Sequence, residues 1–218
     1  MSELIPSVQV GQTVPDFKMT TFEPATGGFG EFDLAAQRKA GKWTVLFFYP
    51  ADFTFVCATE FAALGEVYPH ICKLGAELVT VSTDTQFTHL AWQREEMELS
   101  AVKYPMGADR TGAVSKLFGV YDANGGNALR GTFIISPEGT LMASEVNFYN
   151  NGRNMDELCR KLEANVFLSK NPSDACPARW KHEGDVTLKP SAAMVGRVHQ
   201  AVNAPAAAKP AAKANKSK

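Results

Sequence analysis

The sequence predicts an α/β fold, with a central mixed sheet flanked by helices and a C-terminal arm. An apolar strand at residues 43–49 is followed by a segment with helical spacing and a second apolar strand, and a hairpin-like pair of strands precedes a closing helix. The chain has 218 residues and is 45% hydrophobic, which suits one substantial core with an appendage. We therefore expect one globular domain, residues 1–168.

The first half of the chain contains a strand–helix–strand unit. Residues 43–49, WTVLFFY, are aromatic and β-branched without charge, which is typical of a strand buried on both faces, and Pro50 ends it. The next apolar residues recur at helical spacing, which predicts a helix over residues 55–74 that Gly75 terminates. Residues 76–82, AELVTVS, form the second strand.

The second half continues the alternation of helices and strands. Helices are predicted over residues 86–97 and 112–118. Strands over residues 130–136 and 140–146 flank Pro-Glu-Gly, a turn signal, and a final helix begins near Met155. This order suggests a mixed sheet with helices on both faces, as in a thioredoxin-like fold.

The C-terminal part differs in composition. Residues 169–195 have three prolines and little periodicity, so we interpret them as an arm that lies over another surface and carries Cys176. Residues 196–218 are rich in Ala, Pro and Lys, which predicts a basic, disordered, solvated tail. Binding of the tail to nucleic acid or anionic lipid is the alternative, and we favour the solvated tail.

The remaining composition excludes several classes of protein. The start of the chain has no secretory pattern, and no stretch approaches the roughly 18 apolar residues of a membrane span, so we expect a soluble cytoplasmic protein. Four cysteines are too few and too widely spaced for a secreted disulfide framework, and a pair in a reducing compartment is more often catalytic or metal-binding. No CxxC or HxxxH spacing occurs, so we predict no metal and no cofactor.

Cys57 is placed in the first turn of the helix predicted after the central strand. Free backbone N–H groups and the helix dipole favour a thiolate there, but a helix end supplies about 0.3–1 kcal/mol. Lowering a thiol pKa from about 8.5 to about 6 needs roughly 3.4 kcal/mol, so a nearby cation is required. Without further residues to support the thiolate, Cys57 as a small core residue would be the preferred interpretation.

Three separated motifs reverse that preference. Residues 47–60, FFYPADFTFVCATE, contain Pro-x-x-x-Thr-x-x-Cys; residues 130–135 are RGTFII; and residues 176–180 are CPARW. In this order they resemble the two active-site segments and the resolving-cysteine segment of the typical two-cysteine peroxiredoxins, closest to the bacterial alkyl hydroperoxide reductase C subunit branch. The resemblance extends from about residue 15 to residue 191.

The resemblance implies a role for each matched residue. Cys57 is the thiolate that attacks a peroxide oxygen, and Arg130 is the missing cation that stabilises the thiolate and the charge developing on the peroxide. Cys176 then resolves the sulfenic acid, giving an intersubunit disulfide that an external dithiol reduces. The expected substrates are hydrogen peroxide and alkyl hydroperoxides, and the expected reductant is a flavoprotein disulfide reductase or thioredoxin. The resemblance also implies a homodimer that exchanges its arms, often in a ring of five dimers.

Four further residues are assigned to the pocket by the same resemblance. The Thr54 hydroxyl bonds the peroxide, a role compatible with a helix cap, and Pro50 shields the sulfur as well as ending the strand. Glu60 and Trp92 support the pocket. Ala58 is a departure, because this branch usually has proline after the cysteine, and a restored N–H alters the local unfolding of the helix.

Three other functions were weighed. A thioredoxin-like disulfide reductase needs two cysteines around a two-residue gap, and residues 57–60 offer one. A cysteine hydrolase needs a histidine base, and Arg130 cannot remove a proton. A ring-shaped holdase chaperone remains an alternative. Cys72 and Cys159 are interpreted as core packing, and the four histidines show no ligand spacing.

Overall fold

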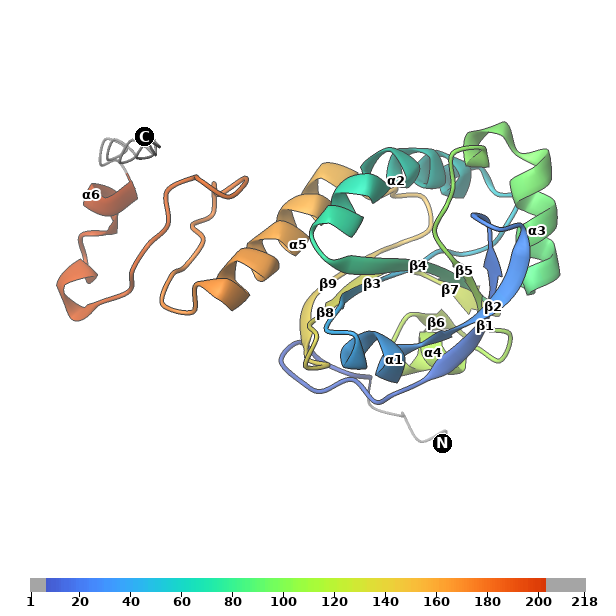
Figure 1. The fold of residues 1–218 in the computed structure, drawn as a ribbon, viewed down its shortest axis with the longest axis horizontal. Coiled ribbons are helices and arrows are strands. Elements are labelled where there is room, and N and C mark those ends of the chain that lie inside the picture. Colours follow the sequence, from blue (N-terminus) through green and yellow to red (C-terminus); the bar gives the residue numbers. More distant parts are fainter. Residues whose placement is uncertain (1–6, 203–218) are drawn as a thin grey trace, which may run out of the picture. The chain divides into compact units, whose positions relative to one another are not determined.

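The computed structural model describes residues 7–202, which form two units (Figure 1). The first unit ends at Leu162 and the second begins at Glu163, and each is described by itself. Most of the predicted tail, residues 203–218, lies outside the described residues. No helix within residues 7–202 is long and apolar enough to cross a membrane.

A seven-stranded mixed sheet organises the first unit. Its order is β2-β1-β5-β4-β3-β8-β9, with β3, β4 and β5 parallel and the other neighbours antiparallel. The strands are β1 Lys18–Glu23, β2 Gly28–Asp33, β3 Trp43–Phe48, β4 Ala76–Ser82, β5 Met106–Ala108, β8 Arg130–Ile135 and β9 Leu141–Asn147. A separate two-stranded hairpin consists of β6 Tyr121–Asp122 and β7 Asn127–Ala128. The predicted mixed sheet is therefore confirmed.

Helices cover both faces of this sheet. Figure 1 shows α2 over one face and α1 and α4 beneath the other. The helices are α1 Leu34–Lys39, α2 Phe55–Lys73, α3 Gln86–Glu95, α4 Ala113–Leu117 and α5 Met155–Lys170, with a 3₁₀ turn at Met97–Leu99. Every residue of β3 is buried, as expected of a central strand with alternate side chains packed into two cores. This strand delivers the chain to α2 from the middle of the sheet.

The predicted helices and strands agree with the structure apart from their bounds. The helix expected over residues 86–97 ends at Glu95, because Glu96 is extended (φ −95°, ψ 115°) and a 3₁₀ turn follows. The Pro-Glu-Gly turn forms the β8–β9 hairpin, and Gly139 adopts the positive φ of 89° that such a turn requires. The short elements β1, β2, α1, β5, β6 and β7 were not predicted.

The second unit begins within α5 and contains little regular structure. In it Ala175 and Leu188 form an isolated antiparallel bridge, with reciprocal N–H to carbonyl contacts of 2.8 and 2.9 Å. Trp180 is buried, and its ring lies 5.8 Å from that of Phe167. A 3₁₀ turn at Ala192–Met194 and α6 at Val198–Val202 follow. The residues around Cys176 are thus held by local contacts of their own.

Candidate active site

Cys57 is the third residue of α2, directly after the loop that leaves β3. Thr54 occupies the N-cap position, and the Ala58 N–H donates to the Thr54 carbonyl at 3.2 Å, so the first turn is closed. The Ala58 N–H that a proline would lack is used in this bond. Cys57 is fully buried. Its sulfur is therefore shielded from water at a helix N-terminus, where the dipole favours negative charge.

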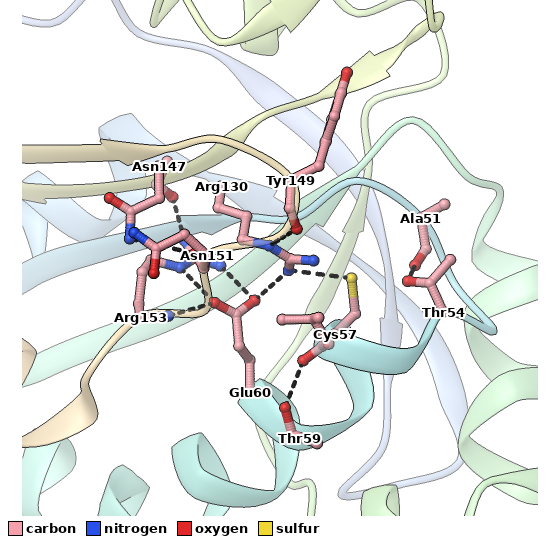
Figure 2. A network of polar contacts seen from close by, with 12 residues as sticks. Ala51, Thr54, Cys57, Thr59, Glu60, Arg130, Asn147, Tyr149, Asn151 and Arg153 are labelled. Atoms are coloured by element: carbon pink, nitrogen blue, oxygen red, sulfur yellow. Dashed lines mark hydrogen bonds and ion pairs between the residues drawn. The ribbon is translucent and has the colours of Figure 1, made fainter.

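Arg130 reaches Cys57 from the first residue of β8. This strand pairs antiparallel with β3, which places the start of β8 beside the end of β3 and the first turn of α2. The Arg130 Nη1 donates to Cys57 Sγ at 3.3 Å, as Figure 2 shows, and the side chain is almost fully buried. Its Nε donates to the Tyr149 carbonyl at 2.7 Å. The cation expected from the sequence is in contact with the sulfur.

Glu60 joins two buried arginines, of which the sequence had indicated one. It accepts from Arg130 Nη1 at 2.6 Å and from Arg153 through the backbone N–H (2.9 Å), Nε (2.9 Å) and Nη2 (3.0 Å). Arg153 also donates to the Gly131 carbonyl, and its guanidinium lies 3.3 Å from the Phe47 ring centroid. No local signal in the sequence distinguished Arg153 from a surface arginine before α5. Figure 2 shows the two arginines converging on the carboxylate.

The charges of this cluster balance when Cys57 is a thiolate. Burial lowers the pKa of Arg153, and its hydrogen bonds to Glu60 oppose that shift, so the ionised pair remains favoured. Two guanidinium groups and one carboxylate leave one positive charge in a dry site, where an uncompensated charge is costly. An anionic sulfur beside Arg130 compensates that charge. The arrangement therefore stabilises a buried nucleophilic thiolate.

The residues of the loop before α2 lie around the sulfur. The Thr54 hydroxyl donates to the Ala51 carbonyl at 2.7 Å and does not cap the helix, although Thr54 stands at the N-cap. With its one proton committed, the Thr54 oxygen is oriented as an acceptor. Pro50 is buried at the end of β3. Phe53 adopts a left-handed backbone with φ 57°, and its ring lies 6.3 Å from that of Trp92.

Trp92 packs behind the loop. It is fully buried, stacks on Tyr49 at 5.9 Å and lies 4.9 Å from Phe61 of α2. These contacts link α3 to both ends of the loop that carries Thr54. Trp92 is therefore in contact with the residues at both ends of this loop.

A buried polar network under the same loop was not predicted. Asp52 Oδ2 lies 2.7 Å from His89 Nδ1, and Asp52 Oδ1 accepts from the Tyr49 hydroxyl at 2.6 Å. His89 Nε2 lies 3.2 Å from the Gly107 carbonyl. Burial raises the pKa of Asp52, and His89 opposes the shift. His89 stands one helical turn before Trp92 in the sequence, and that spacing gives no sign of its partner Asp52 on the loop before α2.

A cavity of about 300 Å³ opens in front of Arg130. Pro50, Thr54, Phe55 and Val56 line one side, and Asp122, Gly125, Asn127, Tyr149 and Asn150 line the other, together with Arg130. The second group comes from the β6–β7 hairpin and the loop after β9, segments for which the sequence gave no functional signal. The cavity opens Arg130 and Thr54 to solvent, whereas Cys57, the residue after Val56, is fully buried and does not line it.

The other cysteines differ in exposure. Cys176 is half-buried in the second unit, between Ala175 of the bridge and the turn that ends at Trp180. Cys72 is exposed, so the prediction of core packing was wrong for it, because the buried stripe of α2 ends at Ile71 and position 72 turns outward. Cys159 is half-buried beside the buried Leu158. No cluster of metal-ligating side chains occurs within residues 7–202.

Comparison with known proteins gives consistent results. The model of the AhpC/TSA family matches residues 10–144. Alkyl hydroperoxide reductase C of Escherichia coli K12 is 42% identical over 170 residues, covering 78% of this chain and 90% of that protein. The Staphylococcus aureus Mu50 protein of the same name is 39% identical over 189 residues, covering 87% and 98%.

Solved structures agree with these sequence matches. The crystal structure of Enterococcus faecalis AhpC aligns with a TM-score of 0.73 at 39% identity, covering 77% of this chain and 98% of that one. Reduced 2-Cys peroxiredoxin of Plasmodium vivax aligns with a TM-score of 0.78 at 33% identity, covering 84% and 94%. The fold expected from the order of strands and helices is therefore confirmed.

Proposed function

Since the chain belongs to the AhpC/TSA family and is a thiol-dependent peroxidase, we propose that Cys57 is its attacking thiolate and Cys176 its resolving thiol. The observation that carries the first assignment is the contact of 3.3 Å between Arg130 Nη1 and Cys57 Sγ within a buried cluster whose charges balance only with a thiolate. The second assignment rests on the resemblance of residues 176–180 to the family's resolving segment.

In the first step the thiolate attacks the terminal oxygen of the hydroperoxide. The S–O bond forms as the O–O bond breaks, two electrons pass from sulfur to the peroxide, and the attacked oxygen keeps its hydrogen. The leaving alkoxide or hydroxide takes one proton from solvent to become alcohol or water. The product on the enzyme is the Cys57 sulfenic acid. Proton transfer to the leaving oxygen accompanies bond cleavage, because an alkoxide is a poor leaving group in a dry site.

The residues around the cavity would position the peroxide and stabilise this transition state. The Thr54 oxygen, whose own proton is bound to Ala51, accepts a hydrogen bond from the peroxide proton. Arg130 retains N–H groups on Nη2 that have no acceptor within the described residues, so they are available to the peroxide oxygens as negative charge spreads onto them. Pro50, without an N–H, shields the sulfur from a competing donor.

The second step requires a further thiol. The Cys176 thiolate attacks the sulfenic sulfur, a disulfide forms and water leaves, after which an external dithiol reduces the disulfide by two thiol–disulfide exchanges. Family membership implies hydroperoxide substrates, a reductant protein and oligomerisation. As finer points we propose an intersubunit Cys57–Cys176 disulfide, a ring of five dimers, and a flavoprotein disulfide reductase or thioredoxin as the reductant.

The test is sulfenic acid trapping in single-turnover conditions. Reduced Cys176→Ser protein is mixed with one equivalent of hydrogen peroxide and then with dimedone, and the label is mapped by mass spectrometry. We expect the label on Cys57 and consumption of the peroxide. Cys72→Ser is the matched control, because it removes an exposed cysteine and should leave the reaction unchanged. Labelling elsewhere, or no consumption, would reject the assignment.

A further inference from the structure

The side chain of Tyr149 ties the β6–β7 hairpin to the loop after β9. The Tyr149 hydroxyl lies 2.5 Å from Asp122 Oδ2 and 2.8 Å from Asn127 Oδ1, which places it against both strands of the hairpin. A phenol has one proton, so it donates to the Asp122 carboxylate. The Asn127 amide, turned over, donates an N–H to the same phenol oxygen, since its O and N positions are interchangeable. We call these three residues the hairpin clamp.

The protonation states of the hairpin clamp do not change near neutral pH. The hydrogen bond from Tyr149 lowers the pKa of Asp122 below its usual range, and burial together with this bond raises the pKa of Tyr149 to about 12. The carboxylate therefore stays ionised and the phenol stays protonated. The direction of the hydrogen bond does not change over the range in which a peroxidase is assayed.

All three residues of the hairpin clamp line the cavity in front of Arg130. Hydrogen peroxide fills little of its volume of about 300 Å³, since a water molecule occupies about 30 Å³ in the liquid. The rest of the cavity can hold the organic group of a larger hydroperoxide between the Pro50–Val56 side and the clamp side. The position of the hairpin therefore sets the width available to that group.

We propose that Tyr149, through the hairpin clamp, is a specificity-determining residue that holds the outer wall of the cavity against the organic group of neutral hydroperoxides. This rests on the proposed function. Hydrogen peroxide has no organic group to place against this wall, so its reaction depends on the wall less than that of an organic hydroperoxide. A neutral organic group gains contact with the wall, whereas an anionic one meets the Asp122 carboxylate.

Tyr149 also contacts Arg130, and the experiment must separate the two roles. The Arg130 Nε donates to the backbone carbonyl of Tyr149, not to its side chain. Tyr149→Phe keeps that carbonyl and the ring and removes only the hydroxyl. If the substitution only loosens the cavity wall, the reactivity with an organic hydroperoxide changes relative to that with hydrogen peroxide. If it displaces Arg130, both reactions slow by the same factor.

The experiment measures second-order oxidation of reduced protein by stopped-flow fluorescence, with hydrogen peroxide and with cumene hydroperoxide. No reductant protein is needed in this single turnover. In Tyr149→Phe we expect the ratio of the cumene hydroperoxide rate to the hydrogen peroxide rate to fall about tenfold, equivalent to about 1.4 kcal/mol. Tyr121→Phe is the matched control, since it removes a hydroxyl from the same hairpin, and the contact of that ring with Lys116 remains.

A double-mutant cycle with Asp122→Ala tests the clamp itself. Both substitutions break the hydrogen bond between Tyr149 and Asp122. Tyr149→Phe combined with Asp122→Ala should therefore lower the ratio of the cumene hydroperoxide rate to the hydrogen peroxide rate no further than the larger single effect. If the double variant lowered this ratio by the product of the two single effects, or if Tyr149→Phe left the ratio unchanged, the inference would be overturned. Failure of the wild type and Tyr121→Phe proteins to react with either peroxide would instead reject the proposed function.

Discussion

Replacing Arg130 with Met is expected to slow two reactions of Cys57 by different amounts. The guanidinium contacts Sγ at 3.3 Å, and with its charge centred about 4 Å away the attraction to a thiolate is about 4 kcal/mol at an effective dielectric of about 20. Loss of that attraction lowers the thiolate population by up to about 10³-fold, since 1.4 kcal/mol is a factor of ten. A less stabilised thiolate is intrinsically more nucleophilic, which recovers about tenfold.

The rate of iodoacetamide alkylation depends on the population and nucleophilicity of the thiolate. The rate of oxidation by peroxide depends in addition on how well the transition state is stabilised. We expect alkylation at neutral pH to slow by roughly 10²-fold and oxidation by hydrogen peroxide to slow further, because Arg130 also faces the charge on the peroxide oxygens. Both rates are measured by stopped-flow on the reduced protein. Arg130→Lys should recover part of each rate, since an ammonium cannot contact Sγ, Glu60 and the Tyr149 carbonyl with one planar fork.

Arg153→Met is the matched control for this comparison. It removes a second buried guanidinium from the same carboxylate but no contact with Sγ, so it disturbs Glu60 and leaves Arg130 beside the sulfur. We expect it to lower stability at least as much as Arg130→Met and to slow alkylation less. Equal slowing in the two variants, or alkylation unchanged in Arg130→Met, would refute the assignment of the thiolate's cation to Arg130.

Four further outcomes are expected. On a non-reducing gel the oxidised protein should run as a disulfide-linked dimer, which persists in Cys72→Ser and is lost in Cys57→Ser or Cys176→Ser; an oxidised monomer would contradict arm exchange. In His89→Ala the buried Asp52 loses the partner that opposes its raised pKa, so ionisation of Asp52 costs more in the folded state. The melting temperature should then fall relative to wild type as pH rises above about 4, the ordinary pKa of an Asp side chain; a parallel pH profile would count against it. Amide hydrogen exchange in the first turn of α2 should be faster in Cys57→Ser than in the thiolate form of the protein. Equal exchange would show that the charge of the thiolate does not stabilise the closed turn. Cys57 should resist over-oxidation: the resemblance implies that relatives which over-oxidise carry a Gly-Gly-Leu-Gly insertion and a Tyr-Phe pair after the resolving cysteine, which together slow unfolding around the sulfenic acid, and residues 93–218 contain neither. Sulfinic acid detected by mass spectrometry at peroxide slightly above working concentration would contradict this expectation.

The sequence predicted the parts of the fold that have strong periodicity. The apolar run of β3 and the helical spacing of α2 located Cys57 correctly, because burial of a central strand and a helix stripe leave direct patterns in the chain. Strands β1 and β2 have few apolar residues, with outward charged residues and two glycines, and β5 has three residues. These strands form because they pair with neighbouring strands of the sheet, and that pairing leaves no local pattern in the sequence.

The candidate site was predictable where a motif carried it and not elsewhere. Arg130 and Glu60 were named because they stand in recognisable segments, and the structure brings both to Cys57. Arg153 and Tyr149 stand in a loop without periodicity, and their positions depend on how β9 pairs with β8. Long-range pairing of this kind decides which side chains converge, so a single sequence without a motif cannot reveal it.

The balanced charges of the cluster also bear on how a buried sulfur can meet a second thiol. Cys57 is fully buried, and a disulfide requires the two sulfurs to approach to about 2.05 Å, so the first turn of α2 must open before any resolving thiol can attack. Oxidation to the sulfenic acid removes the negative charge that balanced Arg130 and Arg153 against Glu60. A buried excess positive charge then disfavours the closed turn, whose first hydrogen bond joins Ala58 to Thr54. In the proposed cycle the same electrostatics therefore stabilise the closed turn in the thiolate form of Cys57 and destabilise it in the sulfenic acid form.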